Sequence, residues 1–534
     1  MSPRPDPAWI RPLSAEAEET ADVLGGKAHG LVLLDRLGLR VPPGFVLTTG
    51  ACRAFLRDGR VPDGLGGELR AAVADLERAT GRRFGGPDRP LAVAVRSGAG
   101  VSMPGMMSTV LNLGLTTGAT EGLAAETGDR AFAADSRLRF LTGFASAVTG
   151  TDAAARAVGA ASGGAEAVER LVRERCGREI PDDAAGQLEW AVEAVFSSWN
   201  TPRARTYRTL HGIPDDLGTA VVVQSMVFGN RDARSGTGVA FSRDPRTGEN
   251  LPFGEVLFGG QGEDVVSGRS RTRPLGDLAT REPAVWAELS DALRRIEEHC
   301  RDACYAEFTF QSGELWMLQV RPGRFVGAAA VRVATELAEA GTIGRAEALL
   351  RVSPRQLRLV RTPRIDPSGA YDLLGRGIGA VPGVATGRVA TTVDAAVRMA
   401  REGPVILVRP ETSPDDMRGL AAATGIVTAR GGPASHAAVV ARSLGKPAVV
   451  GVDGLTVDTE GGRAAVDGRA VGTGTLLTLD GTSGELALGA PRVVTDTADA
   501  PLRRLLAWAD EISGDDSARD ETHRLSAAHA ALRR

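Results

Sequence analysis

The sequence predicts a multidomain α/β protein, and three observations lead to this class. The chain has 534 residues, too many for one hydrophobic core and enough for roughly three or four domains of about 150 residues each. Apolar residues make up 43% of the chain and charged residues 24%, as in a globular protein. Strand-rich, helix-rich and mixed segments also follow one another along the chain, which indicates several folding units in series.

The first two segments differ in their hydrophobic pattern. Residues 1–117 combine short apolar runs with turn signals. Within them, LAVAV at 91–95 has the character of a strand, and the Gly-, Ser-, Pro- and Met-rich stretch after it indicates a loop. Residues 118–212 repeat apolar positions with the period of a helix, as in QLEWAVEAVFSSW. We therefore expect an N-terminal subdomain with strands, followed by a helical insertion.

Strand signals return over residues 213–330, where AEFTF and LWMLQV predict a hairpin with Ser312 and Gly313 at its turn. Residues 331–370 begin with a helical stretch and continue into a Pro- and Arg-rich run, which we expect to be an extended linker. Short strands and helices alternate over residues 371–490, as in a compact α/β module of the swivelling kind. Residues 491–534 have the pattern of a helical tail.

Composition argues against two classes of partner. The net charge is −3 and only 4% of residues are aromatic, so we expect neither a nucleic acid nor a membrane as partner. The N-terminal residues are polar and rich in proline, and no later run reaches about 18 apolar residues, so we expect no signal peptide and no membrane span. The four cysteines lack the spacing of a zinc site, which favours reduced thiols in a cytoplasmic protein.

His436 is the strongest single candidate for chemistry. It lies in TARGGPASHAAVV, where a strand is followed by a glycine-rich turn and Ser435 is a good N-cap for the next helix. At the first turn of that helix, the dipole favours a neutral imidazole, and free N–H groups stabilise a bound anion. Gly431 and Gly432 leave room for such an anion. These features favour a phosphohistidine, and a buried structural histidine is the alternative.

A second group of residues is suited to binding phosphate. The 63 basic residues include only two lysines, Lys27 and Lys446. Lys27 follows two glycines and can bind phosphate as a point charge, whereas Lys446 is either functional or a cation at a helix end. Arg96 can bind phosphate with its planar guanidinium. We expect SGTG at 235–238 to form a turn whose backbone N–H groups face phosphate oxygens at Thr237 and Gly238.

Oxygen ligands for a metal are expected on the predicted hairpin. Glu307 and Gln319 flank its turn on adjacent strands, and Arg321 follows Gln319 by two residues and therefore lies on the same face. Carboxylate and amide oxygens together with phosphate oxygens suit Mg²⁺. The hairpin therefore predicts a magnesium–phosphate site.

These motifs resemble the pyruvate, phosphate dikinase family, more closely than phosphoenolpyruvate synthase or rifampin phosphotransferase. The matching stretches lie between about residues 20 and 490. They are LGGKAHGL, VPPGFVLTT, VRSGAGVSMPGMMSTVLNLGL, QSMVFGNRDARSGTGVAFSRDPRTGE, FGEVLFGGQGEDVVSG, LWMLQVRPG and ILVRPETSPDDM, with GIVTARGGPASHAAVVARSLGKPAVVG.

The resemblance implies a fold and a reaction. It implies an ATP-grasp nucleotide domain made of residues 1–117 and 213–330 with the insertion 118–212, followed by a mobile phosphohistidine domain at 371–490. His436 would attack the β-phosphorus of ATP and release AMP, after which the γ-phosphoryl group would pass to inorganic phosphate. Carried over by position, the residues for ATP and Mg²⁺ are Lys27, Arg96, Gly105, Arg139, Thr237, Gly238, Glu255, Glu263, Glu307, Gln319 and Arg321.

The chain departs from the family pattern in three places. The family's pyruvate-binding barrel has no counterpart in this sequence, where residues 491–534 resemble the run into its first strand. Tyr305 stands where the family has a carboxylate near the nucleotide, which weakens the expected handling of phosphate or metal. Ala434 stands at the position of a regulatory threonine in plant relatives.

Three functions remain open at this point. The first is a phosphotransferase that passes the phosphoryl group to pyruvate or another small molecule, with the acceptor on a separate protein. The others are a non-catalytic nucleotide-binding or regulatory protein and an ATP-grasp ligase that releases ADP. The resemblance is also compatible with a homodimer.

Overall fold

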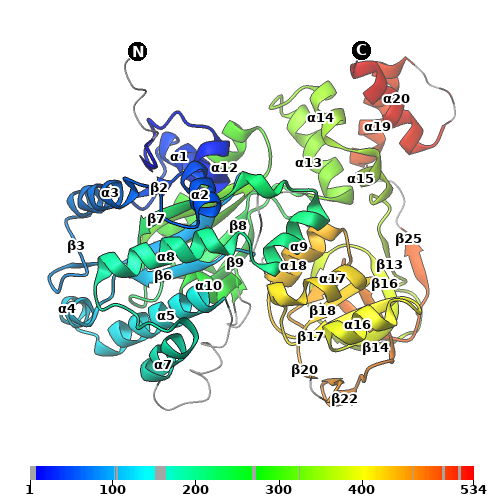
Figure 1. Cartoon of the computed structure of the whole chain (residues 1–534). Helices are drawn as coiled ribbons and strands as arrows, with labels where there is room; N and C mark the ends of the chain where they lie inside the picture. The colour runs from blue at the N-terminus through cyan, green and yellow to red at the C-terminus, as the bar shows by residue number, and fades with distance from the viewer. Residues whose placement is uncertain are drawn as a thin grey trace. The chain divides into compact units, whose positions relative to one another are not determined.

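The protein is a mixed α/β structure with several domains, as the sequence predicts (Figure 1). The computed structural model describes residues 8–101, 103, 106–150, 164–266, 272–323, 325–433, 435–459, 461–495, 500–514, 517 and 519–533. The chain divides into two compact units, Met1–Arg231 with Trp316–Val320 and Asp232–Leu315 with Arg321–Arg534. Within the described residues, no helix combines the length and apolar character that crossing a lipid bilayer requires.

The first unit is built on a sheet with the strand order β1-β2-β7-β5-β6. One face of its central strands lies in the apolar core, and helices supply the rest of that core. Within the described residues, five helices lie between Thr117 and His211, in the range expected to be helical; that this range is an insertion stays a prediction. The strands are β1 (Ile10–Pro12), β2 (Gly44–Leu47), β5 (Val93–Gly98), β6 (Thr109–Leu113) and β7 (Ala220–Ser225), with the short pair β3 (Arg83–Phe84) and β4 (Pro90–Leu91). The helices are α1 (Ala21–Arg36), α2 (Thr49–Asp58), α3 (Leu65–Thr80), α4 (Thr117–Thr127), α5 (Arg130–Thr149), α7 (Gly164–Cys176), α8 (Ala184–Ser198) and α9 (Pro202–His211).

The second unit begins with a sheet of order β10-β9-β8-β11-β12. Ser312 and Gly313 have φ values of 52° and 83°, which is the left-handed pair that a two-residue hairpin turn requires. The predicted hairpin is therefore confirmed. The elements are β8 (Gly236–Phe241), β9 (Phe253–Phe258), β10 (Arg273–Pro274), β11 (Cys304–Gln311), β12 (Glu314–Pro322), α10 (Gly262–Val266), α11 (Asp277–Arg281) and α12 (Pro283–Cys300).

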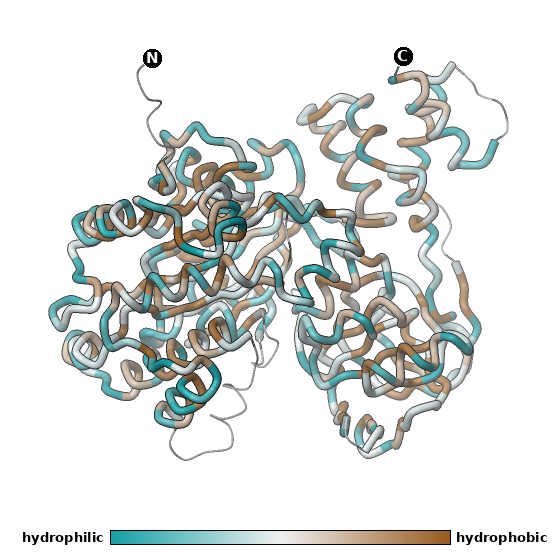
Figure 2. The backbone as a smooth tube through the Cα atoms, viewed as in Figure 1, coloured by the Kyte–Doolittle hydropathy of each residue, from teal (hydrophilic) through white to brown (hydrophobic). Residues whose placement is uncertain are grey.

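Helices from two distant parts of the sequence share one core in this unit. Their hydrophobic segments alternate with hydrophilic ones along the chain (Figure 2), and residues of α13, α14, α19 and α20 pack in a single apolar cluster. The predicted tail therefore packs on the helices that follow the sheet of β8 to β12. The elements are α13 (Gly327–Glu339), α14 (Arg345–Arg351), α15 (Pro354–Arg358), α19 (Ala500–Ser513) and α20 (Glu521–Leu532).

The start of the predicted extended linker is helical. Ser353 forms a capping box with Gln356 and begins α15, so a local helix signal outweighs the nearby prolines. Pro354 itself occupies the first turn, where its missing N–H group costs nothing. Only the later part of the linker is extended, as β13 (Pro363–Ile365) paired with β25 (Val493–Thr495).

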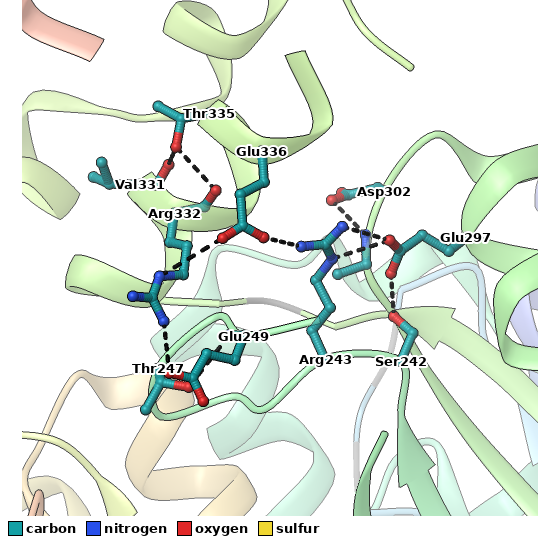
Figure 3. A network of polar contacts seen from close by, with 11 residues as sticks. Ser242, Arg243, Thr247, Glu249, Glu297, Asp302, Val331, Arg332, Thr335 and Glu336 are labelled. Carbon is teal, nitrogen blue, oxygen red and sulfur yellow. Dashed lines mark hydrogen bonds and ion pairs between the residues drawn. The ribbon is translucent and has the colours of Figure 1, made fainter. Parts of the chain in front are cut away.

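A buried ion-pair network holds α13 against the sheet of β8 to β12 (Figure 3). Arg243, which follows β8, is 4% exposed. Its guanidinium donates to Glu297 of α12 at 2.9 Å and to Glu336 of α13 at 2.6 Å. Arg332 extends the network to Glu249 at 3.0 Å. One buried cation thus ties together a strand end and two helices.

The last module is an eight-stranded sheet with the order β14-β24-β23-β16-β17-β18-β19-β15. Strands β16 to β19 run parallel, so their carboxyl ends lie at one edge, where α/β folds place functional groups. The main strands are β14 (Asp372–Arg376), β15 (Ile378–Val381), β16 (Val384–Ala390), β17 (Val405–Arg409), β18 (Gly425–Thr428), β19 (Ala448–Val450), β23 (Leu476–Asp480) and β24 (Glu485–Leu488). A small sheet of β20 (Leu455–Asp458), β21 (Arg463–Val466) and β22 (Arg469–Ala470) and the helices α16 (Val393–Met399), α17 (Met417–Ala422) and α18 (His436–Leu444) complete it.

Candidate functional site

The turn between β18 and α18 places His436 as the sequence predicts. Ser435 caps the helix and accepts a hydrogen bond from the backbone N–H of Ala438, so His436 is the first helical residue. Gly431 has a φ of 105°, a conformation that favours glycine because it has no Cβ. Local sequence signals alone therefore fix where this side chain lies.

The His436 ring is neutral and largely covered. The residue is 9% exposed, and burial lowers the pKa of the imidazole from 6.5 to about 4. The predicted neutral ring is confirmed, although burial is the main cause rather than the helix dipole. Its Nδ1 atom lies 3.0 Å from the Thr412 hydroxyl, whereas Nε2 is buried with no hydrogen-bond partner among the described residues. Nε2 is thus the nitrogen that remains for chemistry.

Sequence reasoning missed Thr412 and Arg442. Thr412 follows β17, which is the parallel neighbour of β18, so a comparison of strand ends would have brought it beside His436. Arg442 of α18 donates to the backbone oxygens of Pro433 at 3.1 Å and Ala380 at 3.3 Å and so fixes the turn before the histidine. Burial, together with the charge of Arg321, lowers the pKa of Arg442 to about 10.

One face of the β9-β8-β11 sheet collects several predicted nucleotide-site residues. Glu307 lies opposite Val239, and Val239 lies opposite Glu255, so both carboxylates point to the same face. Thr237 lies on this face two residues before Val239, and its hydroxyl donates to the Phe308 carbonyl at 3.0 Å. Pairing between strands thus aligns residues that are up to 70 positions apart in sequence.

Two further predicted residues lie close to this face. A Cβ atom built on Gly262 would lie 3.9 Å from the Thr237 hydroxyl, so the start of α10 reaches β8. Glu263 is the next residue of that helix. Arg321, at the end of β12, stacks with its guanidinium 4.1 Å from the ring centre of Tyr305. The sheet therefore brings acidic, hydroxyl and guanidinium groups together.

The predicted SGTG turn is wrong. Gly236, Thr237 and Gly238 belong to β8, which pairs with β9 on one side and β11 on the other, so the backbone N–H groups of this stretch belong to a sheet. Gly238 is required by packing, because a Cβ there would lie 2.6 Å from the Phe308 ring. The glycines that suggested a turn instead admit aromatic rings against a strand. A role of Thr237 and Gly238 in binding nucleotide stays a prediction.

Glu255 also contacts the histidine turn. It is 4% exposed and accepts a hydrogen bond from the Thr272 hydroxyl. A Cβ atom on Gly432 would lie 1.9 Å from a Glu255 carboxylate oxygen, so a side chain at position 432 would force that carboxylate to move. The close approach gives Gly432 a steric role beside the phosphate-binding role that the sequence suggested.

In the first unit, Lys27 and Arg96 lie at the same strand end. Arg96 and Gly98 point to the same face of β5 because they are two residues apart, and a Cβ on Gly98 would lie 3.2 Å from that of Lys27. Arg96 is buried and donates to the side chain of Gln224 and, at 3.1 Å, to the Leu318 carbonyl. The neighbouring residue, Gln319, therefore belongs to the same unit as Lys27.

The remaining predicted residues receive less support. Arg139 pairs with Asp135 of its own helix at 2.7 Å, and its predicted contact with nucleotide stays a prediction. Gly105 lies outside the described residues. Lys446 donates to carbonyls at the end of α17, including that of Leu420 at 3.0 Å, so it acts as a helix-end cation.

The donor set fits Mg²⁺ only together with a phosphorylated ligand. Among the described residues, no group of three or more His, Cys, Asp or Glu side chains forms a candidate metal site. Mg²⁺ requires six oxygen ligands and is commonly held by one or two protein side chains with phosphate oxygens and water. That Glu307 and Gln319 supply these side chains stays a prediction.

Comparison with known proteins shows the family. Residues 61–274 match the pyruvate phosphate dikinase AMP/ATP-binding domain, and residues 401–484 match the mobile domain of PEP-utilising enzymes. The chain is 41% identical to pyruvate, phosphate dikinase of Rhizobium meliloti (strain 1021) over 94% of its own length and 60% of that protein. It is 37% identical to the Clostridium symbiosum dikinase with the same coverages, and 40% identical to a chloroplastic dikinase of Arabidopsis thaliana over 92% and 53%.

The chain belongs to the pyruvate, phosphate dikinase family. It spans about 60% of the length of the bacterial dikinases it matches. The AMP/ATP-binding match contains Arg96, Thr237, Glu255 and Glu263, and the mobile-domain match contains His436 and its partner Thr412. The candidate residues Lys27, Glu307, Gln319 and Arg321 lie outside both matches.

Proposed function

We propose that this chain is a dikinase-type phosphotransferase in which His436 accepts a phosphoryl group from ATP and AMP is released. The observation that carries this proposal is the His436 ring. It is neutral, Thr412 binds its Nδ1 atom, and its Nε2 atom has no hydrogen-bond partner among the described residues. A neutral nitrogen with an available lone pair is a nucleophile.

The proposed reaction has two transfers. Nε2 attacks the β-phosphorus of ATP, and the bond from that phosphorus to the oxygen bridging to the α-phosphorus breaks, so AMP leaves with the bridging oxygen. The γ-phosphoryl group then passes to inorganic phosphate as pyrophosphate, and phosphohistidine remains. Thr412 supports this chemistry when Nδ1 carries the ring proton and donates a hydrogen bond to the Thr412 hydroxyl oxygen. The lone pair of the ring then lies on Nε2.

We propose an ATP-grasp arrangement for the nucleotide. Its anionic phosphates would be bound by cations such as Lys27, Arg96, Arg139 and Arg321, with Gly105, Thr237, Gly238, Glu255 and Glu263 contributing further contacts. Bidentate guanidinium groups and a lysine point charge suit phosphates. Glu307 and Gln319 would hold Mg²⁺, which stabilises negative charge on phosphate oxygens when bound.

The burial of His436 implies movement during the reaction. A phosphoryl group on Nε2 needs space that the covered ring lacks, so the module of residues 371–490 would have to swing away from its present contacts. The proposed phosphoryl acceptor is pyruvate, which the names of the relatives contain, or another small molecule, bound on a separate protein.

Product analysis with labelled ATP tests the proposal. Incubation with ATP labelled at the β-phosphorus, Mg²⁺ and phosphate should give AMP and an acid-labile, base-stable label on the protein. His436→Ala should abolish both, whereas His523→Ala should change neither, because His523 is an exposed histidine on α20. Release of ADP would favour a ligase instead, and an absence of turnover would favour a nucleotide-binding or regulatory protein.

A further inference from the structure

Tyr305 lies between an aromatic ring and a guanidinium in the second unit. It is 3% exposed, and its ring centre is 5.0 Å from that of Phe241 in an edge-to-face arrangement. Its other contact is with Arg321, whose guanidinium lies 4.1 Å from the ring centre of Tyr305. Edge-to-face packing and cation–π stacking both restrict orientation. Phe241 therefore fixes the Tyr305 ring, and the ring in turn holds the Arg321 guanidinium.

The Tyr305 ring acts on Arg321 as a neutral surface. Burial, reinforced by the negative charge of Glu307, raises the pKa of the Tyr305 phenol, so the hydroxyl keeps its proton in the working range of pH. Because position 305 carries no charge, it cannot neutralise Arg321, and the full positive charge stays available to a phosphate.

Phe241 connects this pair to the helix of His436. The Arg442 guanidinium lies 5.4 Å from the Phe241 ring centre, and Phe241 also packs edge-to-face on Phe325 at 6.3 Å. Phe241 is thus fixed from several directions, and it gives Tyr305 a rigid support. The order of contacts is Arg442, Phe241, Tyr305 and Arg321.

We propose that Tyr305 is the positioning residue for Arg321 and thereby sets the affinity for the ATP phosphates. The aromatic ring replaces an ion pair as the device that orients the guanidinium. This inference rests on the proposed function, in which Arg321 binds ATP. The family pattern marked Tyr305 as a residue that weakens phosphate binding. In this inference it instead orients Arg321, one of the proposed phosphate-binding cations.

Steady-state kinetics of AMP formation separate positioning from simple packing. Tyr305→Leu should raise the KM for ATP about five- to tenfold with kcat within about twofold, since loss of a cation–π contact is of that size. Tyr305→Phe keeps the ring and should stay within about twofold of the parent. Phe310→Leu is the matched control, because Phe310 is a buried ring of the same strand that packs on Phe258 instead; it should leave KM unchanged.

A double-mutant cycle supplies the decisive result. In an Arg321→Ala background, Tyr305→Leu should have no further effect on ATP affinity, because the guanidinium that it positions is gone. An equal effect in both backgrounds, or equal effects of Tyr305→Leu and Phe310→Leu on KM, would overturn the proposal.

The same cycle on unliganded protein separates this inference from the proposed function. Thermal unfolding of the four proteins without ATP should show that the two substitutions are not additive. Failure to make AMP would contradict the proposed function while leaving this coupling measurable, and additive effects would contradict the positioning role whether or not AMP is made.

Discussion

The candidate residues of the histidine turn and those of the β9-β8-β11 sheet are brought together in different ways. The histidine turn is residues 428–445, which contain the strand end, the glycines, the cap and the proposed nucleophile His436. On the sheet, Glu255, Tyr305 and Glu307 meet only because β9, β8 and β11 pair in register. The first site is encoded locally and the second by tertiary structure.

This difference has a physical consequence for robustness. A local turn depends on backbone preferences and on a few contacts, so substitutions there should change chemistry more than folding. The sheet depends on long-range packing, which includes the buried network around Arg243 (Figure 3). Substitutions in that network should loosen the sheet and its helices while leaving the histidine turn intact.

Arg243→Met should produce the largest effect. It leaves Glu297 in a largely buried position without its cation, and breaking a buried pair costs about 3–5 kcal/mol. Hydrogen exchange of α13 amides should accelerate at least about 100-fold, with β17 and β18 unchanged. The control is Arg294→Met, whose ion pairs with Asp291 and Glu298 are exposed and contribute little. Equal acceleration in α13 and β18 would contradict two separately stabilised regions.

Acid should destabilise the module of residues 371–490 through protonation of His436. Its pKa is about 4 in the folded protein against 6.5 ordinarily, so the unfolded chain binds the extra proton between those pH values. Stability therefore falls as the pH drops from 6.5 to 4, by about 3 kcal/mol in total.

Denaturant unfolding at several pH values, compared with His436→Asn, measures this contribution. The difference in stability between the two proteins should change across pH 6.5 to 4 and stay constant above 6.5. A constant difference over the whole range would show that the histidine titrates equally in both states, as an exposed ring would.

Gly432→Ala should have the smallest of the three effects and should act on chemistry. The new Cβ would lie 1.9 Å from the Glu255 carboxylate, so either that carboxylate or the turn has to move. We expect about tenfold slower labelling of the protein by ATP, equivalent to about 1.4 kcal/mol, with ATP binding unchanged. Gly403→Ala, where a Cβ meets nothing within 4 Å, is the control. An unaltered labelling rate would mean that this contact has no part in transfer.

The same contrast explains what the sequence could predict. The cap at Ser435, the turn at Gly431 and the hairpin at Ser312 follow from local preferences, and all three are present. The SGTG stretch misled because glycine also serves strands that must admit rings such as that of Phe308. Thr412 was missed because only the strand order brings it to the histidine turn.

Burial was the property least accessible from sequence. Gly431 and Gly432 suggested room for an anion beside His436, whereas the structure covers Nε2. Likewise, the family pattern showed only that Tyr305 replaces a carboxylate. The contacts of its ring with Phe241 and Arg321, which suggest a positioning role, are visible only in the structure. Such contacts depend on packing between strands and cannot be read from one segment.

The most direct test is to locate the phosphoryl group after reaction with ATP and Mg²⁺. Peptide mapping at alkaline pH should find it on the peptide that contains His436, as a phosphohistidine that acid removes. Lys27→Ala should leave the fold intact and the peptide unmodified, since the ATP site is then impaired. A modified residue elsewhere, or AMP formation with His436 unmodified, would contradict the central claim.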